Sequence, residues 1–556
     1  MSSSERLKLY QQLFFEKKFS QIINEIENFE KIKNSQILNI LGVCKMMKKK
    51  KNKEDLLSAN ENFREAYLKE KHSSAGLEAL ANFMNVSVDL GEFEESIKYY
   101  KEEEKNFDYN EKLLKALSRI YQFSIRKNER KKILERIIKN KSKSLEVWCS
   151  YIYINNFENI FDQKKHYEIA KEFSKQIEDY GLKKIKLDEN IKKRKIALGF
   201  LTADFHGKYS LTYFLKGLIK NINKNKFHLI GISNRKINDE SREELKLLFD
   251  ELIEINSLDD LNAINFIRQK KLDIIFDVMG VTSKNRIALF KNKISPIQIN
   301  WLGYCNTTGL DEMDYIFCDP NLIFGEEEKY YSEKVKRLPE IWNAHPGFNQ
   351  KREKIKLPLL KNNYFTFASL NNFNKISDIT LKCWSEILKK TQNSKLVLKS
   401  SISFNLDNFI ERLNKFEIFD QVHILKTTED FFSHLKQYDE IDLALDTFPY
   451  NGVTTTFEAL WKGIPVLTIE GYNFNSRCGD SIIKNSGIDF LIAKDQNDYV
   501  SKAIFLAKNK DKLIEIRNDI FENALKTPLF NISKFAKNFE KLIEECISEK
   551  LLMKNN

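Results

Sequence analysis

The sequence predicts an α-solenoid followed by an α/β region of two halves, each built on a mostly parallel sheet. Three observations lead to this prediction. An apolar spacing recurs about every 37 residues in the first third of the chain. From residue 195 onward, short apolar runs alternate with helical stretches, and a polar segment over 346–361 divides these runs into two sets. A chain of 556 residues, 42% of them apolar, is long enough for several globular domains.

The first third of the chain, residues 1–185, carries the repeat. Corresponding positions hold small or apolar residues, as in the series Ile22, Ala59, Ser96, Ile133 and the series Ile26, Phe63, Tyr100, Ile137. Residues three or four apart share one helix face, so each unit predicts two amphipathic helices. The stretches "ANENFREAYLKE" and "LGEFEESIKYYKE" resemble the second helix of tetratricopeptide (TPR) repeats, whose usual unit is about 34 residues. The alternative is an ordinary helical domain. We expect a TPR-like arm that recruits a protein partner and does no chemistry.

The α/β region begins at residue 195. Its first half, over 195–345, contains the apolar runs "KIALGFLTADF", "FHLIGISN", "LDIIFDVMG", "IQINWLGY" and "DYIFCDP". The second half, over 360–545, contains "YFTFASL", "KLVLKS", "QVHILK", "LALDTF", "PVLTIE" and "FLIA". Helical stretches such as 211–223 and 258–271 separate these runs. Alternation of this kind is typical of a parallel sheet covered by helices, so two Rossmann-like halves are expected.

The composition restricts the class of protein. The sequence contains no apolar stretch long enough to span a membrane, and its first residues lack the features of a signal peptide, which predicts a cytoplasmic protein. The seven cysteines are scattered without metal-ligand spacing, so no metal site is expected. The net charge of +12 favours anionic substrates or surfaces. Because the one dense basic run, "KMMKKKKNK" over 45–53, coincides with a predicted turn, we do not expect nucleic-acid binding.

One strand-to-helix junction of the second half predicts an anion-binding site. In "LALDTFPYNGVTTTFEALWKG" a strand ends, a turn follows, and a helix begins with a threonine as the expected N-cap. The N-terminus of such a helix attracts phosphate. Gly452 allows the backbone to approach a ligand, the hydroxyls of Thr454, Thr455 and Thr456 add donors, and Glu458 is placed to accept from sugar hydroxyls. A nucleotide diphosphate fits this distribution; a purely structural cap is the alternative.

The preceding strand-to-helix junction of the same half points to the same ligand. In "FTFASLNNFNKISDITLK" the strand ends near Leu370 and the helix starts at Ser377. The loop between them holds Asn371, Asn372 and Lys375. Its amides and its lysine suit a diphosphate, with Lys375 as the charge that stabilises a departing nucleotide. The alternative is a surface turn with a solvated lysine.

These stretches resemble the protein O-GlcNAc transferase family, especially its SPINDLY-like and bacterial branch. The resemblance is carried by "DTFPYNGVTTTFEAL", "SRCGDSIIKNSG", "SLNNFNKIS" and "SPIQINWLGYCNTTGLDEMDY", which occur in the expected order over residues 195–510. The resemblance implies a GT-B type glycosyltransferase of two Rossmann-like halves, inverting and independent of a metal or other cofactor. It also implies a sugar nucleotide as donor and Ser or Thr hydroxyls of a protein as acceptor.

The family's donor-binding positions carry over onto several residues of this sequence. The resemblance implies a lysine on the diphosphate and an acidic residue on the ribose, and it adds one histidine to the predicted site. The matching positions are Asn372, Lys375, His434, Thr454, Thr455 and Glu458.

The match fails where the acceptor would be activated. Family members carry a histidine four residues after the Asp-Phe that ends the first strand, whereas this chain has Lys208 at that spacing and His206 only two residues after Asp204. Histidines found elsewhere in the family are replaced by Val281 and Val453. Displacement at an anomeric carbon requires a group that takes the acceptor proton. His206 is the first candidate for that role and Asp204 the second.

The sequence leaves several functions open. The main hypothesis is a protein glycosyltransferase that uses UDP-GlcNAc, with GDP-fucose as the alternative donor. A second class is a scaffold that has kept its nucleotide pocket and lost activity, and a nucleotide-sugar epimerase is a third. The acceptor protein is not specified, and a homodimer through the helical arm is an expectation from the resemblance.

Overall fold

A computed structural model describes residues 3–29, 34–48, 52–205, 210–399, 405–428 and 430–555. The chain forms two compact units, which consist of Met1–Val147 with Ser401–Arg412 and of Trp148–Ser400 with Leu413–Asn556. No helix within the described ranges is both long enough and apolar enough to cross a membrane.

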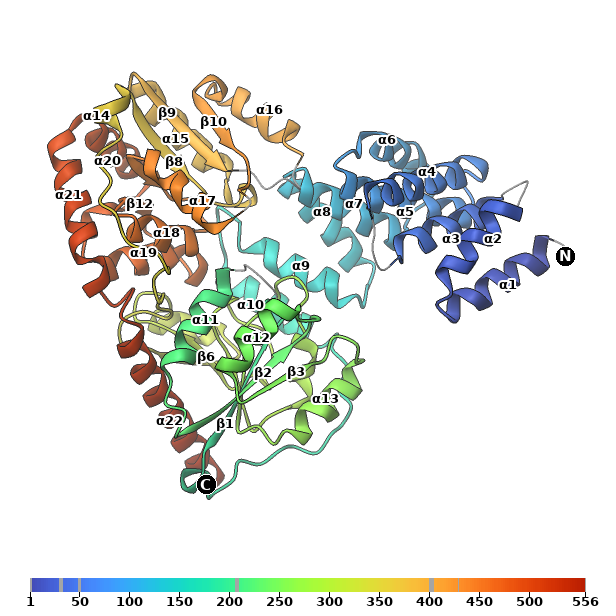
Figure 1. Ribbon diagram of the computed structural model, residues 1–556, viewed down its shortest axis with the longest axis horizontal. Coiled ribbons are helices and arrows are strands. Elements are labelled where there is room, and N and C mark those ends of the chain that lie inside the picture. Colours follow the sequence, from blue (N-terminus) through green and yellow to red (C-terminus); the bar gives the residue numbers. More distant parts are fainter. Residues whose placement is uncertain are drawn as a thin grey trace. The chain divides into compact units, whose positions relative to one another are not determined.

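The first unit is helical, as the repeat predicts (Figure 1). Its helices, together with the one that ends beyond its boundary, are α1 (Ser3–Phe15), α2 (Phe19–Phe29), α3 (Ser35–Met46), α4 (Lys53–Lys69), α5 (Ser74–Leu90), α6 (Glu94–Glu103), α7 (Glu111–Phe123), α8 (Lys127–Lys139) and α9 (Leu145–Asn155). Polar caps start several of them, including Asn52 in a capping box with Asp55. The basic run lies between α3 and α4, with residues 49–51 outside the described ranges.

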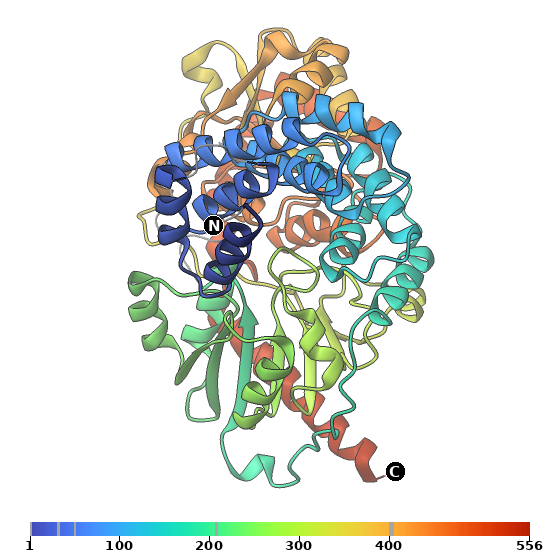
Figure 2. The same cartoon turned by 90° about the vertical axis from the view of Figure 1, so that its right-hand side faces the viewer.

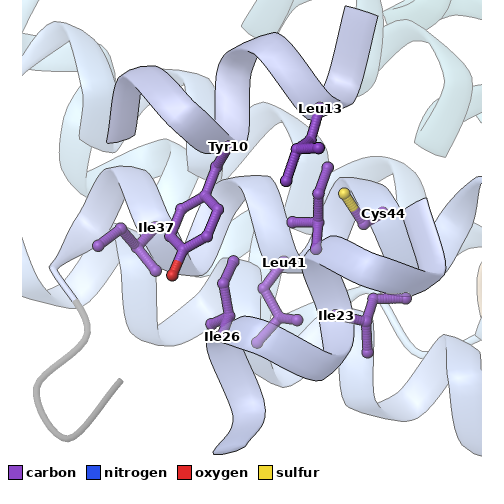
Figure 3. Close-up of a cluster of buried hydrophobic side chains, with 8 residues drawn as sticks. Tyr10, Leu13, Ile23, Ile26, Ile37, Leu41 and Cys44 are labelled. Carbon is purple, nitrogen blue, oxygen red and sulfur yellow. The ribbon is translucent and has the colours of Figure 1, made fainter. Parts of the chain in front are cut away.

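The predicted repeat positions lie in the core of this unit. Figure 3 shows the first cluster, in which side chains of α1, α2 and α3 meet, among them Tyr10, Ile26 and Leu41. Ile26 is fully buried, and Phe63 and Tyr100 at corresponding positions are at most 2% exposed. The recurring apolar residues therefore mark the surfaces along which successive helices stack.

The second unit contains two parallel sheets. The first has seven strands in the order β3-β2-β1-β4-β5-β6-β7, the arrangement of a dinucleotide-binding sheet extended by one strand. Its strands are β1 (Ile196–Thr202), β2 (Phe227–Ser233), β3 (Glu251–Glu254), β4 (Ile274–Asp277), β5 (Ile297–Asn300), β6 (Tyr315–Cys318) and β7 (Lys334–Arg337). The helices between them are α11 (Ser210–Asn221), α12 (Asp239–Leu248) and α13 (Asp260–Gln269).

The second sheet repeats this topology with the order β10-β9-β8-β11-β12-β13. Its strands are β8 (Phe365–Ser369), β9 (Ser394–Lys399), β10 (Val422–Leu425), β11 (Leu443–Leu445), β12 (Val466–Ile469) and β13 (Ile492–Ala493). The helices over residues 359–523 are α14 (Leu359–Asn362), α15 (Asp378–Lys390), α16 (Asp407–Lys415), α17 (Phe431–Lys436), α18 (Thr454–Trp461), α19 (Phe474–Ser486), α20 (Gln496–Lys508) and α21 (Lys510–Asn523). The predicted fold class, a helical arm before two parallel α/β halves, is confirmed.

The last helix, α22 (Ile532–Asn555), packs on the first sheet although it follows the second half in the sequence (Figures 1 and 2). The ring of Phe539 lies 5.3 Å from that of Phe276 and 4.7 Å from that of Trp301. Glu549 forms ion pairs with Lys334 and Lys336 of β7. The chain thereby returns to the half where the α/β region began.

The last helix pair of the region that carries the repeat consists of the end of α9 together with α10 (Gln163–Ser174). This pair lies in the second unit. Asn156, 1% exposed, accepts hydrogen bonds from Asn306 of the first half at 2.9 Å and from Asn475 of the second half at 2.8 Å. A Cβ atom on Gly309 would lie 2.2 Å from the carbonyl oxygen of Ala170, so α10 packs directly against backbone. This helix pair is thus built into the α/β unit and contacts both halves.

Candidate functional site

The predicted donor-binding residues lie at the carboxyl edge of the second sheet, where the strand order reverses. Strands β8 and β11 are adjacent and parallel, with Leu443 paired to Phe367. The segment with Asn371 and Lys375 follows β8, and the segment from Asp446 to Glu458 follows β11. In open parallel sheets this crevice is where ligands bind.

Asp446, at the end of β11, organises the turn before α18. Its carboxylate accepts from the backbone N–H groups of Thr447 and Gly452 at 2.8 Å each and from the hydroxyl of Thr468 at 2.8 Å. Burial raises the pKa of Asp446 to about 6, while these hydrogen bonds and Lys375 act in the opposite direction. The loop is therefore held by a buried acid and not by apolar packing alone.

Gly452 is required for the close approach of two loops. The hydroxyl of Thr455 donates to Asn371 at 2.8 Å across the crevice. A Cβ atom at Gly452 would lie 2.5 Å from the Thr455 hydroxyl oxygen and 2.6 Å from Oδ1 of Asn371. Only glycine leaves room for this hydrogen bond.

Helix α18 begins at Thr454, and its start differs from the prediction. We expected a threonine as N-cap, but the N-cap is Val453 and makes no side-chain cap hydrogen bond. Threonines instead fill the first turn, where Thr456 bonds back to the carbonyl of Gly452 at 3.2 Å. Within the described part of the chain, the backbone N–H groups of Thr454 and Thr455 and the hydroxyl of Thr454 have no acceptor. This uncapped helix start leaves donors for an anion.

Lys375 reaches the same place from the other loop. Its ammonium donates to the carbonyl oxygen of Asn451 at 2.8 Å, on the turn that leads into α18. Burial lowers the pKa of Lys375 below that of a free lysine, and Asp446 partly opposes this. A partly desolvated cation beside free helix N–H groups is suited to a diphosphate.

A second polar cluster surrounds Glu458. This carboxylate, 4% exposed, accepts from the hydroxyl of Tyr438 at 2.7 Å and contacts Nε2 of His434 at 2.9 Å. The Nδ1 atom of His434 lies 2.5 Å from the amine of Lys399 at the end of β9. Because an ammonium only donates, Nδ1 accepts and Nε2 carries the proton that Glu458 accepts. These linked hydrogen bonds bring His434, Lys399 and Glu458 together beside the first turns of α18.

Asn371, and not its predicted neighbour Asn372, is the asparagine that lies buried in the crevice. Asn372 is exposed, and its side chain accepts from the N–H of Asn374 at 2.9 Å, so it shapes the turn that carries Lys375. Its neighbour Asn371 is 5% exposed and faces Thr455 and Asp446. Direct donor binding by Asn372 stays a prediction.

The edge of the first sheet holds the candidates for acceptor chemistry. Asp204 follows β1, and burial raises its pKa. Asp277 ends the adjacent strand β4; it accepts from the N–H groups of Met279 and Gly280 at 3.0 Å each, and burial raises its pKa to about 6. His206, the first candidate base, lies outside the described residues.

Helix α19 connects the two halves. Arg477 forms two hydrogen bonds with Glu327 of the first half, at 2.7 and 2.8 Å, and Ser481 donates to Asp319 at 2.7 Å. A bidentate, largely buried pair of this kind fixes orientation as well as distance. The motif "SRCGDSIIKNSG" therefore has a structural role at the junction of the halves.

Several site residues were not identified from the sequence. Asp446 opens the motif "DTFPYNGVTTTFEAL" but was given no role, and Lys399 and Tyr438 belong to no motif. An aspartate that follows a strand, or a lysine that ends one, is a detectable signal. Among the residues that the structure describes, no group of three or more His, Cys, Asp or Glu side chains is arranged to hold a metal ion.

Comparison with known proteins gives a family match over most of the α/β region. The family model for glycosyl transferase family 41 matches residues 156–345 and 349–539. A protein of Solanum lycopersicum described as a probable UDP-N-acetylglucosamine–peptide N-acetylglucosaminyltransferase SPINDLY is 28% identical over 370 residues, covering 64% of this chain and 39% of that protein. Its namesake from Arabidopsis thaliana is 27% identical over 368 residues, covering 63% of this chain and 40% of that protein. The chain thus spans about 40% of the length of these relatives.

Among solved structures, a mutant of the O-GlcNAc transferase of Thermobaculum terrenum is similar to this chain. The two superpose with a TM-score of 0.79 and 19% sequence identity, over 90% of this chain and 95% of the other. The likeness shows that the folds agree along nearly the whole chain, including the two α/β halves expected for a GT-B architecture.

Proposed function

Because this chain belongs to glycosyl transferase family 41, we propose that it transfers N-acetylglucosamine from UDP-GlcNAc to Ser or Thr hydroxyls of a protein. The reaction proceeds with inversion and without a metal or other cofactor. The observation that carries the proposal is the convergence of Lys375, the Asn371–Thr455 pair and the uncapped start of α18 at one sheet edge. The names of the plant relatives support this choice of donor and acceptor.

In this proposal the residues at the second sheet bind the donor and stabilise the leaving group. The diphosphate lies against the N–H groups of Thr454 and Thr455, and Lys375 neutralises the charge that develops as the nucleotide departs. The ribose hydroxyls face Glu458, which His434 and Tyr438 hold in place. A group at the first sheet takes the proton of the acceptor hydroxyl, with His206 and then Asp204 as candidates. The helical arm recruits the acceptor.

Mass spectrometry of the full chain co-expressed with host proteins tests this function. The purified protein and the host proteins are then supplied with UDP-GlcNAc or GDP-fucose. With UDP-GlcNAc, we expect the intact mass of an acceptor protein to increase by one N-acetylhexosamine. An increase by one deoxyhexose would establish the fucosyl alternative, and nucleotide binding without transfer or donor hydrolysis would identify a scaffold.

Replacing Gly452 with alanine should weaken donor binding. The new Cβ atom must displace Thr455 or Asn371, so their hydrogen bond is lost at a cost of about 1 kcal/mol. Calorimetric titration with UDP should show a roughly fivefold lower affinity. Gly325→Ala is the control because its Cβ atom would meet nothing within 4 Å; equal UDP affinities for the two variants would show that the approach of the two loops is irrelevant to binding.

The rate should fall at alkaline pH with a pKa below that of free lysine. Lys375 acts as a cation, and burial lowers its pKa in the unliganded protein, so the active form is lost as pH rises through that lowered value. The profile of kcat/KM for donor hydrolysis measures this, because it reports the free enzyme. A rate that stays constant up to the ordinary lysine pKa would contradict the assignment.

A further inference from the structure

An aromatic contact links Lys375 to the last helix pair of the repeats. The ammonium of Lys375 lies 4.8 Å from the centroid of the Tyr450 ring, within the range of a cation–π interaction. Tyr450 belongs to the turn before α18, two residues before Gly452. Because its ring faces the lysine, it stabilises the charged form of Lys375 in a place where burial disfavours it.

The other side of Tyr450 is covered by the segment that ends α9. The Phe157 ring is stacked on that of Tyr450, with centroids 4.5 Å apart and planes at 20°, and the Tyr153 ring lies 6.0 Å away at 56°. Phe157 is 4% exposed. Asn156, beside it, is fixed to both halves through Asn306 and Asn475. The helix pair therefore holds Tyr450 in a defined position.

Among the residues that the structure describes, three other side chains act electrostatically on Lys375. Asp446 at the end of β11 favours its charged form, and the thiols of Cys478 on α19 and of Cys305 on the loop after β5 also lie within electrostatic range. Burial holds the pKa of Cys478 well above its usual range and likewise raises that of Tyr450, so both stay neutral. A substitution of Tyr450 leaves Asp446 and both thiols unchanged.

We propose that Tyr450 and Phe157 are positioning residues for Lys375. Phe157 presses the Tyr450 ring against the ammonium, so that the helix pair built into the α/β unit sets both the place and the charge of the lysine that meets the diphosphate. The inference rests on the proposed function of Lys375, and it gives this helix pair a part in the reaction that is distinct from recruitment of the acceptor.

Calorimetric titration of the full chain with UDP, and in parallel with GDP, at a series of pH values above neutrality tests this role. In the wild type, affinity should decline as Lys375 loses its proton. In Tyr450→Leu the decline should begin about half a unit to one unit lower, because the cation–π interaction is lost. Tyr450→Phe keeps the ring and should retain the wild-type profile. Phe157→Leu should shift the profile in the same direction by a smaller amount.

Two further variants distinguish a failure of the proposed function of Lys375 from a failure of the positioning role. Phe161→Leu removes another ring of the same segment, which stacks on Tyr472 at 5.9 Å, and should leave the profile unchanged. Lys375→Met should abolish the alkaline decline. If the decline persists in Lys375→Met, the proposed function of the lysine is wrong. If it disappears there but Phe157→Leu and folded Tyr450→Leu both match the wild type, only the positioning role is overturned. Should Tyr450→Leu not fold, Phe157→Leu alone decides.

Discussion

Replacing Lys375 with alanine is expected to lower the rate of transfer and of donor hydrolysis by roughly 10²- to 10³-fold, the usual effect of removing one group that stabilises transition-state charge. The fold should survive, because among the described residues the side chain makes a single hydrogen bond, to the carbonyl of Asn451. Steady-state kinetics with UDP-GlcNAc, together with thermal unfolding, measures both effects.

Lys389→Ala is the matched control for this variant. Lys389 lies on α15, shortly after Lys375, and forms an ion pair with Glu417 at the surface. An exposed pair contributes little, so turnover should stay close to the wild type. If Lys375→Ala retained activity comparable with that of Lys389→Ala, the lysine would have no part in departure of the nucleotide.

Glu458→Ala should reduce stability and donor binding together. Its carboxylate accepts from Tyr438 and His434. Truncation would leave Nε2 of the partly buried His434 without this acceptor, and the hydroxyl of Tyr438 would keep only its longer bond to the carbonyl of Thr455, at 3.3 Å. An unsatisfied group costs about 1–3 kcal/mol and a lost hydrogen bond about 1 kcal/mol, so a loss of roughly 2–4 kcal/mol is expected. Denaturant unfolding measures this loss, and calorimetry measures the fall in UDP affinity.

Glu458→Gln separates the two effects, since it keeps one acceptor oxygen but removes the charge. We expect most of the stability to return while UDP affinity stays below that of the wild type. Glu417→Ala, a carboxylate exposed at the surface of the same half, should change neither quantity appreciably. Full UDP affinity in Glu458→Ala would remove this residue from the donor site.

The fold was predictable because its signals are local. Apolar spacing located the helices of the arm, and apolar runs located the central strands of both sheets. The strands β3 and β7 escaped detection, since they are short edge strands whose sequences, "ELIE" and "KVKR", are at least half charged. Edge strands bury only part of their side chains and so lack the continuous apolar run of a central strand.

The proposed donor site was partly predictable, because some of its signals are also local. Gly452, the threonines and Lys375 belong to strand-to-helix junctions, which a sequence displays. Which of two adjacent asparagines faces the crevice depends on the backbone of the turn. The resemblance implies Asn372 as a donor-binding residue, which stays a prediction, and Asn371 is the buried one of the two. The prediction of the N-cap of α18 was wrong, because a run of β-branched residues offers several equivalent positions at which the helix can begin.

Contacts between distant segments could not be predicted. Phe157 and Tyr450 are separated by almost 300 residues, and neither has a motif that names its partner. The same holds for Lys399 and His434, which meet because β9 and α17 lie at the same sheet edge. The role of His206 stays a prediction.

The central claim is that Lys375 and the start of α18 hold the diphosphate of a sugar nucleotide. Calorimetric titration of the wild type and of Lys375→Ala with UDP and uridine, and with GDP and guanosine, tests it most directly. The account predicts that the wild type binds UDP far more tightly than uridine and that Lys375→Ala loses most of this difference. Equal affinity of the wild type for each diphosphate and its nucleoside, or an undiminished preference in Lys375→Ala, would contradict it.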